Sequence, residues 1–317
     1  MLVIVALAFV VATLVIRALP LPNNVALVIA VGSPYVVLVA LLGLVVAVLN
    51  RLMVLSIVAV AVTAASVAVQ VHWYYGGRSD GVAAEHVDVR VLSANLRYGR
   101  ADPAEFVELA RGSADLITVT ELTAEAVKRF YSAGIDEEFP HSILFPAPNA
   151  GGNGIWSRYP LIPLSATRYW NSGMVAALVH IPGVPIDPAL ASVHITSPMA
   201  SFQSWRNGVT ATKSRLGGLA EAVGQGAVIA AGDFNSTPDM RQFRDLIADR
   251  YHDAIRDTGA GFTPTFPSDT VLPPMITIDH VLTRHANVTS IRSVDVDGSD
   301  HRALLATVDV PIASSRS

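Results

Sequence analysis

The first 77 residues contain only two charged side chains, Arg17 and Arg51, and no aspartate or glutamate. The rest of the chain therefore holds 20 of the 22 basic residues and all 26 acidic residues, a net charge of −6. Such a charge-free quarter is expected in lipid, whereas the remainder is expected in water. The pattern excludes a wholly soluble chain and a disordered one. The acidic balance disfavours a protein that binds nucleic acid through bulk positive charge.

Three apolar runs, at about 2–19, 25–49 and 52–71, predict a multi-pass membrane region over residues 1–75. Each is long enough for a helix across a hydrocarbon core of about 30 Å. The alternatives are two spans, or a cleavable signal peptide at the start. The signal peptide is disfavoured because no basic segment precedes the first run and two more apolar runs follow it. The Gly32-Ser33-Pro34 sequence predicts a kink in the second run.

The orientation of the membrane region rests on the two arginines. Each lies in a different loop, so a simple count of positive charges gives no preference. Arg17 sits at the end of an apolar run and can snorkel, whereas Arg51 is the only charge between two long apolar runs. Weighting Arg51 predicts an integral protein of the plasma membrane whose following domain lies outside the cytoplasm.

After a short linker at 76–85, residues 86–312 alternate between short apolar strands and amphipathic helices, and residues 313–317 form a tail. Strands outnumber helices and do not simply alternate with them, which favours an α+β fold with packed sheets over a doubly wound parallel sheet. Strands are expected at 87–94, 116–120, 154–157, 174–181, 190–196, 227–231, 276–282 and 303–310, and helices at 103–110, 124–132 and 204–223.

Polar side chains stand at the ends of several of these expected strands. Asn95, Glu121 and Asp233 each follow an apolar stretch, and Asn235, His194, Asp279, Asp300 and His301 occupy similar places. Carboxylates brought together repel each other, and a hard divalent cation relieves that repulsion. Carboxylate and amide oxygens are ligands that Mg²⁺ or Mn²⁺ accepts. The absence of cysteine excludes thiolate metal sites, disulfides and a cysteine nucleophile.

Each of these signals has an ordinary structural explanation when taken alone. Glu121 is compatible with a solvated carboxylate at a strand end, and the Gly-Asp-Phe-Asn sequence at 232–235 with a turn. His194 is compatible with a hydrogen-bonded structural histidine, and Asp300 with a loop cap. Their order along the chain is the more specific feature.

In that order the sequence resembles the endonuclease/exonuclease/phosphatase superfamily, of deoxyribonuclease-like or neutral sphingomyelinase-like type, over about residues 86–312. The resemblance rests on Asn95, Glu121, the Asn153–Pro160 segment, His194, Gly232-Asp233-Phe234-Asn235, Ile278-Asp279-His280 and Ser299-Asp300-His301. It implies a four-layer αββα sandwich, here preceded by about three transmembrane helices, with the site at one edge of the two sheets.

The resemblance also implies roles for these residues. Glu121 would be the principal ligand of Mg²⁺ or Mn²⁺, supported by Asn95 and Asp300. Asp233 would orient or deprotonate the attacking water, and Asn235 would hold the phosphate and that base. The pair of His301 with Asp279 would stabilise the phosphoryl oxygens, and His194 would contact the phosphate or assist the leaving group. Asn153 and Arg158 would contribute to substrate binding.

One departure from the family pattern affects His194. Family nucleases of the deoxyribonuclease type pair this histidine with a glutamate, but residues 139–186 contain no acidic residue and Asn149 lies near that place. A neutral partner does not raise the pKa of an imidazole as a carboxylate does. His194 is therefore expected to donate to phosphate as a neutral group rather than to act as a general acid.

The sequence favours a membrane-anchored, divalent-metal-dependent phosphodiesterase or phosphatase that acts on a phosphate ester, with lipid or envelope-linked esters among the possible substrates. The first alternative is a membrane-anchored nuclease, since five basic residues could gather near the cleft: Arg97, Arg100, Arg158, Arg206 and Lys213. The second is a non-catalytic membrane module with the same fold, which the complete set of metal and base residues disfavours.

Overall fold

The structure is a computed structural model that describes residues 1–77, 85–169 and 172–312. The chain forms two compact units. The helical unit comprises Met1–Gly76 together with Thr237–Asp245, and the sheet unit comprises Gly77–Ser236 and Leu246–Ser317. Most of the linker and all of the tail expected at 76–85 and 313–317 lie outside the described residues.

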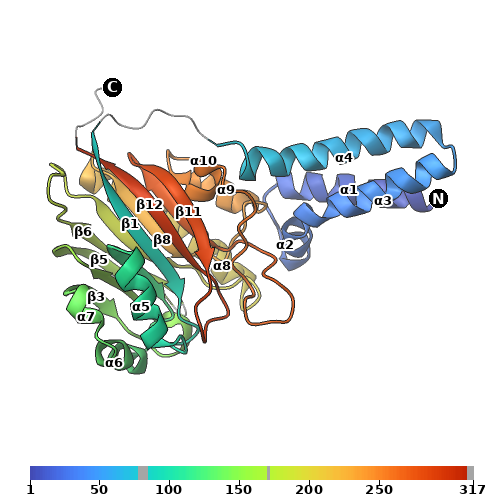
Figure 1. The fold of residues 1–317 in the computed structure, drawn as a ribbon. Coiled ribbons are helices and arrows are strands. Elements are labelled where there is room, and N and C mark those ends of the chain that lie inside the picture. The colour runs from blue at the N-terminus through green and yellow to red at the C-terminus, as the bar shows by residue number, and fades with distance from the viewer. Residues whose placement is uncertain (78–84, 170–171, 313–317) are drawn as a thin grey trace. The chain divides into compact units, whose positions relative to one another are not determined.

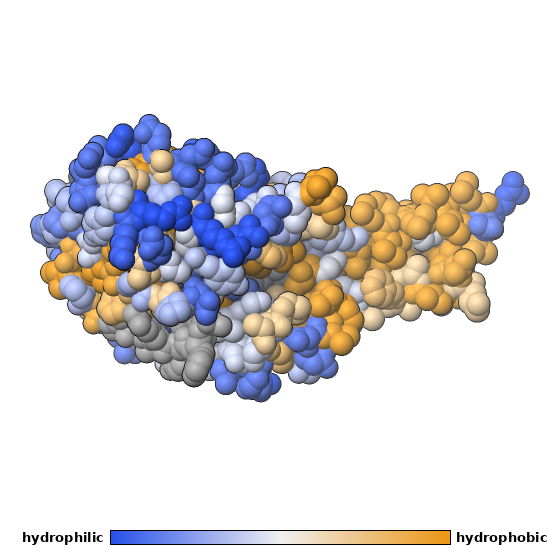
Figure 2. Space-filling model, turned by 90° about the horizontal axis from the view of Figure 1, so that it is seen from below, coloured by the Kyte–Doolittle hydropathy of each residue, from blue (hydrophilic) through white to orange (hydrophobic). Residues whose placement is uncertain are grey.

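The helical unit is built from apolar helices joined by short turns. Its elements are α1 (Leu2–Ala18), α2 (Asn24–Val31), η1 (Ser33–Tyr35), α3 (Val36–Leu49) and α4 (Met53–Tyr74). Small residues lie at the helix contacts, where Ala47 and Ala59 are fully buried beside Leu7 and Ala40 beside Val10, which lets the backbones approach closely. The outer surface of these helices is dominated by hydrophobic side chains (Figure 2).

Among the described residues, one helix, Met53–Tyr74, is both long and apolar enough to cross a membrane. The pair Asn24–Val31 and Ser33–Leu49 passes the same test as a single broken span, bent by 44°. The bend lies at the Gly32-Ser33-Pro34 sequence, where the sequence predicts a kink. Leu2–Ala18 is apolar but shorter, at 17 residues. Three spanning helices therefore remain a prediction.

A buried polar cluster lies inside the helical unit. The carboxylate of Asp239 accepts hydrogen bonds at Oδ1 from Nε of Arg17 at 2.6 Å, from Oγ of Ser33 at 2.7 Å and from Nε2 of Gln70 at 3.2 Å. Arg244 also donates to the main-chain carbonyl of Arg17. A nine-residue segment distant in sequence therefore neutralises the charge at the end of α1.

The sheet unit contains two six-stranded sheets, with strand orders β11-β12-β1-β2-β4-β3 and β5-β6-β7-β8-β10-β9. In the first sheet the strands are β1 (His86–Asn95), β2 (Leu116–Thr120), β3 (His141–Phe145), β4 (Asn153–Ser157), β11 (Asn287–Val294) and β12 (Ala303–Pro311). In the second they are β5 (Leu161–Tyr169), β6 (Ser172–Val179), β7 (Ala189–His194), β8 (Val228–Asp233), β9 (His252–Asp253) and β10 (Asp279–Arg284). The sheets pack face to face, with β1 against β8 and β2 against β7 (Figure 1).

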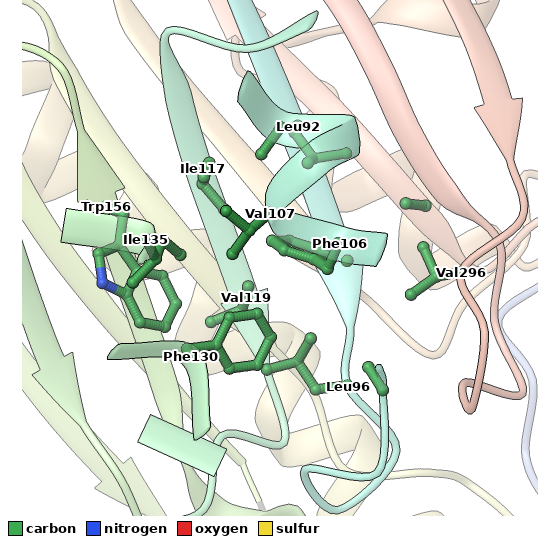
Figure 3. Packing of buried hydrophobic residues seen from close by; sticks show 14 of the residues in the cluster. Leu92, Leu96, Phe106, Val107, Ile117, Val119, Phe130, Ile135, Trp156 and Val296 are labelled. Carbon is green, nitrogen blue, oxygen red and sulfur yellow. The ribbon is translucent and has the colours of Figure 1, made fainter. Parts of the chain in front are cut away.

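Helices cover the outer faces of both sheets. The helices of the sheet unit are α5 (Pro103–Ser113), α6 (Ala124–Ser132), α7 (Ile135–Glu138), α8 (Phe202–Val223) and α10 (Ala254–Thr258), with the short turn η2 (Asn149–Gly151) before β4. α9 (Arg241–Ile247) lies mostly in the segment that belongs to the helical unit. Phe106 of α5 and Phe130 of α6 pack edge to face, 5.2 Å between ring centroids, over Leu92 and Ile117 of the first sheet (Figure 3). On the other side α8 buries Trp205 and Leu216. The unit is therefore a mixed α+β fold with two sheets between helices, which confirms the fold class.

Helix starts follow the capping pattern of the sequence. The Asp102 side chain accepts from the amides of Ala104 and Glu105 at the start of α5, and Thr123 accepts from Ala126 at the start of α6. Both are oxygen-bearing residues that satisfy amides left without a helical partner. These caps fix where each helix begins and so where the preceding strand must end.

Candidate active site

The candidate residues lie at one edge of the two sheets because of strand direction. β1 runs parallel to β2 and β7 runs parallel to β8, so each pair delivers its carboxyl ends to the same edge. Asn95, Glu121, His194 and Asp233 end or follow these four strands. β10 is antiparallel to β8 and begins with Asp279 directly opposite Asp233. His301 lies two residues before β12, which is antiparallel to β1.

Asn95 connects the two sheets at the centre of this edge. Its Nδ2 donates to Oε1 of Glu121 at 3.2 Å and to Oδ2 of Asp233 at 3.1 Å. One amide group therefore holds a carboxylate from each sheet at hydrogen-bond distance. The second oxygen of Glu121 accepts from the amide of Tyr98 at 2.7 Å.

Three turns at the site are closed by the functional side chains or by their neighbours. The side-chain Oδ1 of Asn95 accepts from the amide of Arg97 at 2.8 Å, and Asp233 Oδ1 accepts from the amide of Asn235 at 2.8 Å. Ser299 Oγ accepts from the amide of His301 at 3.0 Å. Such bonds to the residue two positions ahead are typical of Asx and Ser/Thr turns. Each strand end is thereby held rigid.

Two of the functional residues occupy the left-handed backbone region. The φ angles are +58° at Glu121 and +46° at Asn235, conformations that cost free energy outside glycine and cluster at functional sites. At Gly232, with φ +152°, a Cβ would lie 2.0 Å from the carbonyl oxygen of Val193. Only glycine allows β8 to approach β7 this closely just before Asp233.

The carboxylates at the centre carry raised pKa values. Burial raises the pKa of Glu121. Burial and the neighbouring Asp279 raise the pKa of Asp233 to about 6, against the lowering effect of His301. One ligand atom each from Asp233, Asp279 and His301 lies within 4.8 Å of the others. A divalent cation stabilises the ionised form of buried carboxylates whose pKa values are raised, and the oxygen donors of Glu121, Asn95 and Asp300 fit Mg²⁺ or Mn²⁺.

His301 and Asp279 form a buried ion pair. Nδ1 of His301 lies 2.8 Å from Oδ2 of Asp279, and Nε2 lies 3.9 Å from Oδ2 of Asp233. Burial alone would lower the pKa of His301, but the two carboxylates raise it to about 10. The imidazole is therefore protonated at neutral pH and supplies a fixed positive charge.

His194 has a main-chain partner in place of a carboxylate. Its Nδ1 donates to the carbonyl oxygen of Ala150 at 2.9 Å, because a carbonyl can only accept. Nε2 then points toward Oδ2 of Asp233 at 3.6 Å. Burial lowers the pKa of His194 despite the charge of Asp233. The partner of His194 is therefore the neutral carbonyl of Ala150, the neighbour of Asn149, where family nucleases have a glutamate.

Asp300 lies at the more open side of the site. Its Oδ2 is 3.8 Å from Nε of Arg97, and Arg97 also pairs with Asp269 at 2.6 Å. The charge of Asp300 contributes to the raised pKa of Glu121, so the two carboxylates act on each other.

Asn235 directs its Nδ2 to Oδ2 of Asp233 at 3.0 Å and to the carbonyl of Ile195 at 2.8 Å.

The two residues expected to bind substrate stand at opposite ends of β4, with Asn153 beside Thr120 at the site edge and Arg158 after the far end. Asn153 is buried between the sheets, where Nδ2 donates to Oγ of Ser192 at 3.1 Å. Arg158 follows Ser157, the last residue of β4, which pairs with Leu116 at the start of β2. Glu121 follows the opposite end of β2, so the two side chains leave the sheet at opposite edges. Its guanidinium donates to the carbonyl of Ala114 at 3.0 Å and pairs with Glu138. The structure does not bring Arg158 to the candidate site.

A second aspartate–histidine pair, not expected from the sequence, supports the loop after β8. Nδ1 of His280 lies 2.6 Å from Oδ2 of Asp253, and Nε2 donates to the carbonyl of Ser236 at 2.9 Å. Both side chains are fully buried. His280 follows Asp279 on β10, so the two side chains point to opposite faces of the strand. Asp279 contacts His301, and His280 supports the loop. The sequence signal for the Asp253–His280 pair is limited to the adjacent residues Asp279 and His280.

The sequence model of the Endonuclease/Exonuclease/phosphatase family matches residues 92–301. Among proteins with curated annotation, none matches this sequence.

Solved structures share the fold at low sequence identity. An endonuclease/exonuclease/phosphatase from Bacteroides vulgatus superposes with a TM-score of 0.58 at 17% identity, covering 71% of this chain and 99% of that one. D. rerio TDP2 complexed with a single-strand DNA product gives a TM-score of 0.57 at 17% identity, covering 70% and 98%. A Beutenbergia cavernae protein of the same description gives 0.53 at 19% identity, covering 72% of each chain.

Proposed function

This chain belongs to the endonuclease/exonuclease/phosphatase family, and we propose that it is a membrane-anchored, divalent-metal-dependent phosphoesterase that hydrolyses a phosphate ester by in-line attack of water. Members of the family are generally metal-dependent phosphoester hydrolases. The observation that carries the proposal is the Asn95 amide, which holds Glu121 and Asp233 together at the sheet edge. A non-catalytic module is disfavoured because the expected metal ligands and the expected base, Asp233, are all present.

The residues divide into three tasks. Glu121, with Asn95 and Asp300, offers the oxygen donors for Mg²⁺ or Mn²⁺, and charge neutralisation at the phosphate is what the bound ion supplies. Asp233, whose pKa of about 6 leaves it largely ionised at neutral pH, accepts the proton of the attacking water. Asn235 holds Asp233 by a hydrogen bond at 3.0 Å.

Two histidines complete the phosphate-binding side. Protonated His301 places its charge where negative charge develops on the phosphoryl oxygens, a preorganised contribution that needs no rearrangement during the reaction. His194 keeps its Nδ1 proton on the carbonyl of Ala150, so only its Nε2 faces the site. Because neutral His194 carries its single proton on Nδ1, its Nε2 is an acceptor, and donation to a phosphoryl or leaving oxygen would require a second proton on the ring.

Anchoring and orientation are supported by the helical unit. Its apolar, lipid-compatible surface and the spanning helix Met53–Tyr74 favour a membrane location. The charge of Arg17 is neutralised by Asp239, which leaves Arg51 as the loop charge that is free to orient the helices. We therefore place the Arg51 loop in the cytoplasm and the site outside it, where phosphate esters of lipids or the cell envelope would be accessible.

A nuclease is the second candidate. It is favoured by the fold shared with D. rerio TDP2, which was solved with a single-strand DNA product. Against it, Arg97 is already paired with Asp269 at 2.6 Å and lies 3.8 Å from Asp300. The net charge of −6 on residues 78–317 also opposes binding to a polyanion.

The test uses the purified full-length protein in detergent with Mg²⁺, assayed on bis-p-nitrophenyl phosphate, on plasmid DNA and on phospholipid vesicles. EDTA should abolish hydrolysis, and added Mg²⁺ or Mn²⁺ should restore it. Glu121→Gln should lower the apparent metal affinity and recover part of its activity at high Mg²⁺. The control is Glu125→Gln, an exposed glutamate of α6 that should behave like the parent protein. Turnover that is undiminished in EDTA would refute metal dependence, and cleavage of DNA alone would select the nuclease.

A further inference from the structure

A second group of metal-ligating side chains lies at the opposite end of β1 from Asn95. His86 and Asp88 are two residues apart on β1 and so share one face of the strand. Asp88 pairs directly across the antiparallel register with Asp309 of β12. One ligand atom from each of the three residues lies within 4.8 Å of the others. Nε2 of His86 is 3.2 Å from Oδ1 of Asp88 and 3.9 Å from Oδ2 of Asp309.

The carboxylate of Asp309 is only weakly compensated by the described residues around it, since His86 lies 3.9 Å away. The residue is 1% exposed, and its Oδ2 accepts no hydrogen bond from any described residue. Its Oδ1 has a weak contact with Oγ1 of Thr289 at 3.5 Å. A buried carboxylate oxygen without a donor is costly, and a second carboxylate directly across the strand pair adds repulsion. The arrangement is therefore incomplete without a positive charge.

We propose that His86, Asp88 and Asp309 form a second cation site that fits Zn²⁺ and is separate from the catalytic centre. Tetrahedral Zn²⁺ with bonds of about 2.0–2.1 Å keeps its ligand atoms about 3.3–3.4 Å apart. The two distances from His86, 3.2 and 3.9 Å, match this value after a shift of about half an ångström. The three protein donors leave the fourth position to water.

The donor set distinguishes this site from the catalytic one. Imidazole favours Zn²⁺, whereas a set of carboxylate and amide oxygens favours Mg²⁺ or Mn²⁺. Nine residue steps of β1 separate His86 from Asn95, which corresponds to about 30 Å along an extended strand. An ion at this distance cannot take part in catalysis. It would instead connect the start of β1, at His86 and Asp88, to Asp309 of β12. This is the end of β1 at which the chain enters the sheet unit.

The test measures Zn²⁺ binding to the full-length protein in detergent with saturating Mg²⁺. Bound zinc is counted by mass spectrometry of the metal after desalting, and the affinity is measured by calorimetry. His86→Ala and Asp88→Asn should each lose one zinc equivalent or weaken its binding at least about 10-fold, the effect expected when a site loses a ligand or its support. Their side chains are 29% and 66% exposed, so both variants are expected to fold.

The matched control is His180→Ala. His180 also pairs with an aspartate, Asp187, at 3.1 Å, and that pair belongs to no group of three metal-ligating side chains among the described residues. This variant should keep the full zinc content of the parent. A Zn²⁺-dependent rise in melting temperature should likewise be present in the parent and in the control, and absent in His86→Ala.

Two results would overturn the inference. The first is an equal zinc content and affinity in the parent and in His86→Ala. The second is a single zinc equivalent that disappears in Asp233→Asn but persists in His86→Ala, which would place the ion among Asp233, Asp279 and His301. Neither result bears on phosphoesterase activity, so the zinc site and the proposed function fail independently.

Discussion

Replacing Asp279 by asparagine tests how the buried pair with His301 sets the pH dependence of stability. Asparagine keeps the size of the side chain but removes the charge that lies 2.8 Å from Nδ1. In the parent protein the carboxylates, opposed by burial, hold the pKa of His301 at about 10. Once Asp279 is neutral, burial is opposed only by the charges of Asp233 and Asp300, and this pKa should fall.

The sign and size of the effect follow from proton linkage. The imidazole stays protonated in the folded protein up to about pH 10, whereas in the unfolded chain it loses its proton near pH 6.5. Its contribution to stability is complete below pH 6.5 and is lost as the pH rises through 10. At 1.36 kcal/mol per pKa unit the upper bound is roughly 5 kcal/mol, and an effective dielectric of about 20 reduces it to about 2–3 kcal/mol.

The assay is thermal unfolding in EDTA, followed by tryptophan fluorescence at several pH values from 6.5 to 10. With about 2–4 °C per kcal/mol for a domain of this size, Asp279→Asn should melt roughly 5–10 °C below the parent at pH 6.5. That gap should close as the pH approaches 10. The control is Asp295→Asn, which removes an exposed ion pair with Arg302 and should give a small gap that does not vary with pH. A gap for Asp279→Asn that is constant or grows with pH would refute the reasoning.

Three further substitutions separate structural from functional roles. Arg158→Ala should lower the melting temperature by several degrees while kcat/KM in excess Mg²⁺ stays at the parent value; a selective rise in KM would return this residue to substrate binding. His280→Gln should reduce kcat about 10–100-fold with little change in KM, because the loop carrying Asn235 loses its support; steady-state kinetics on bis-p-nitrophenyl phosphate decides it. Burial alone would raise the pKa of Asp115, but hydrogen bonds and charge from Arg90 lower it. Stability from that pair is therefore present above pH 4 and lost on acidification, so Asp115→Asn should flatten urea stability between pH 5 and pH 2, and an unchanged slope would contradict it.

The interior strands could be predicted from the sequence, but the edge strands could not. The eight expected strands correspond to β1, β2, β4, β6, β7, β8, β10 and β12, all of which have neighbours on both sides. The four that were missed, β3, β5, β9 and β11, are the edges of the two sheets. Edge strands carry polar residues and prolines, such as Pro163 in β5, and so lack a continuous apolar pattern.

The sequence predicts site residues well when they end neighbouring parallel strands. It predicts them less well when a single motif runs along the full length of one strand. Glu121 and Asp233 end parallel buried strands, so their proximity follows from topology. Asn153 and Arg158 belong to one motif in sequence, yet they stand at opposite ends of β4. Spacing along the chain does not give the direction of a strand within its sheet. The Asp253–His280 pair was missed because its members are 27 residues apart.

The inclusion of residues 237–245 in the helical unit has a consequence for biosynthesis. Arg17 emerges from the ribosome 222 residues before its counter-charge, Asp239. At about 5–20 residues per second, the helices wait on the order of 10–45 s before the pair can form. During that interval Arg17 must rely on water or on lipid headgroups. The helical unit therefore completes its packing only after β1 to β8 have been synthesised, although its helices are made first.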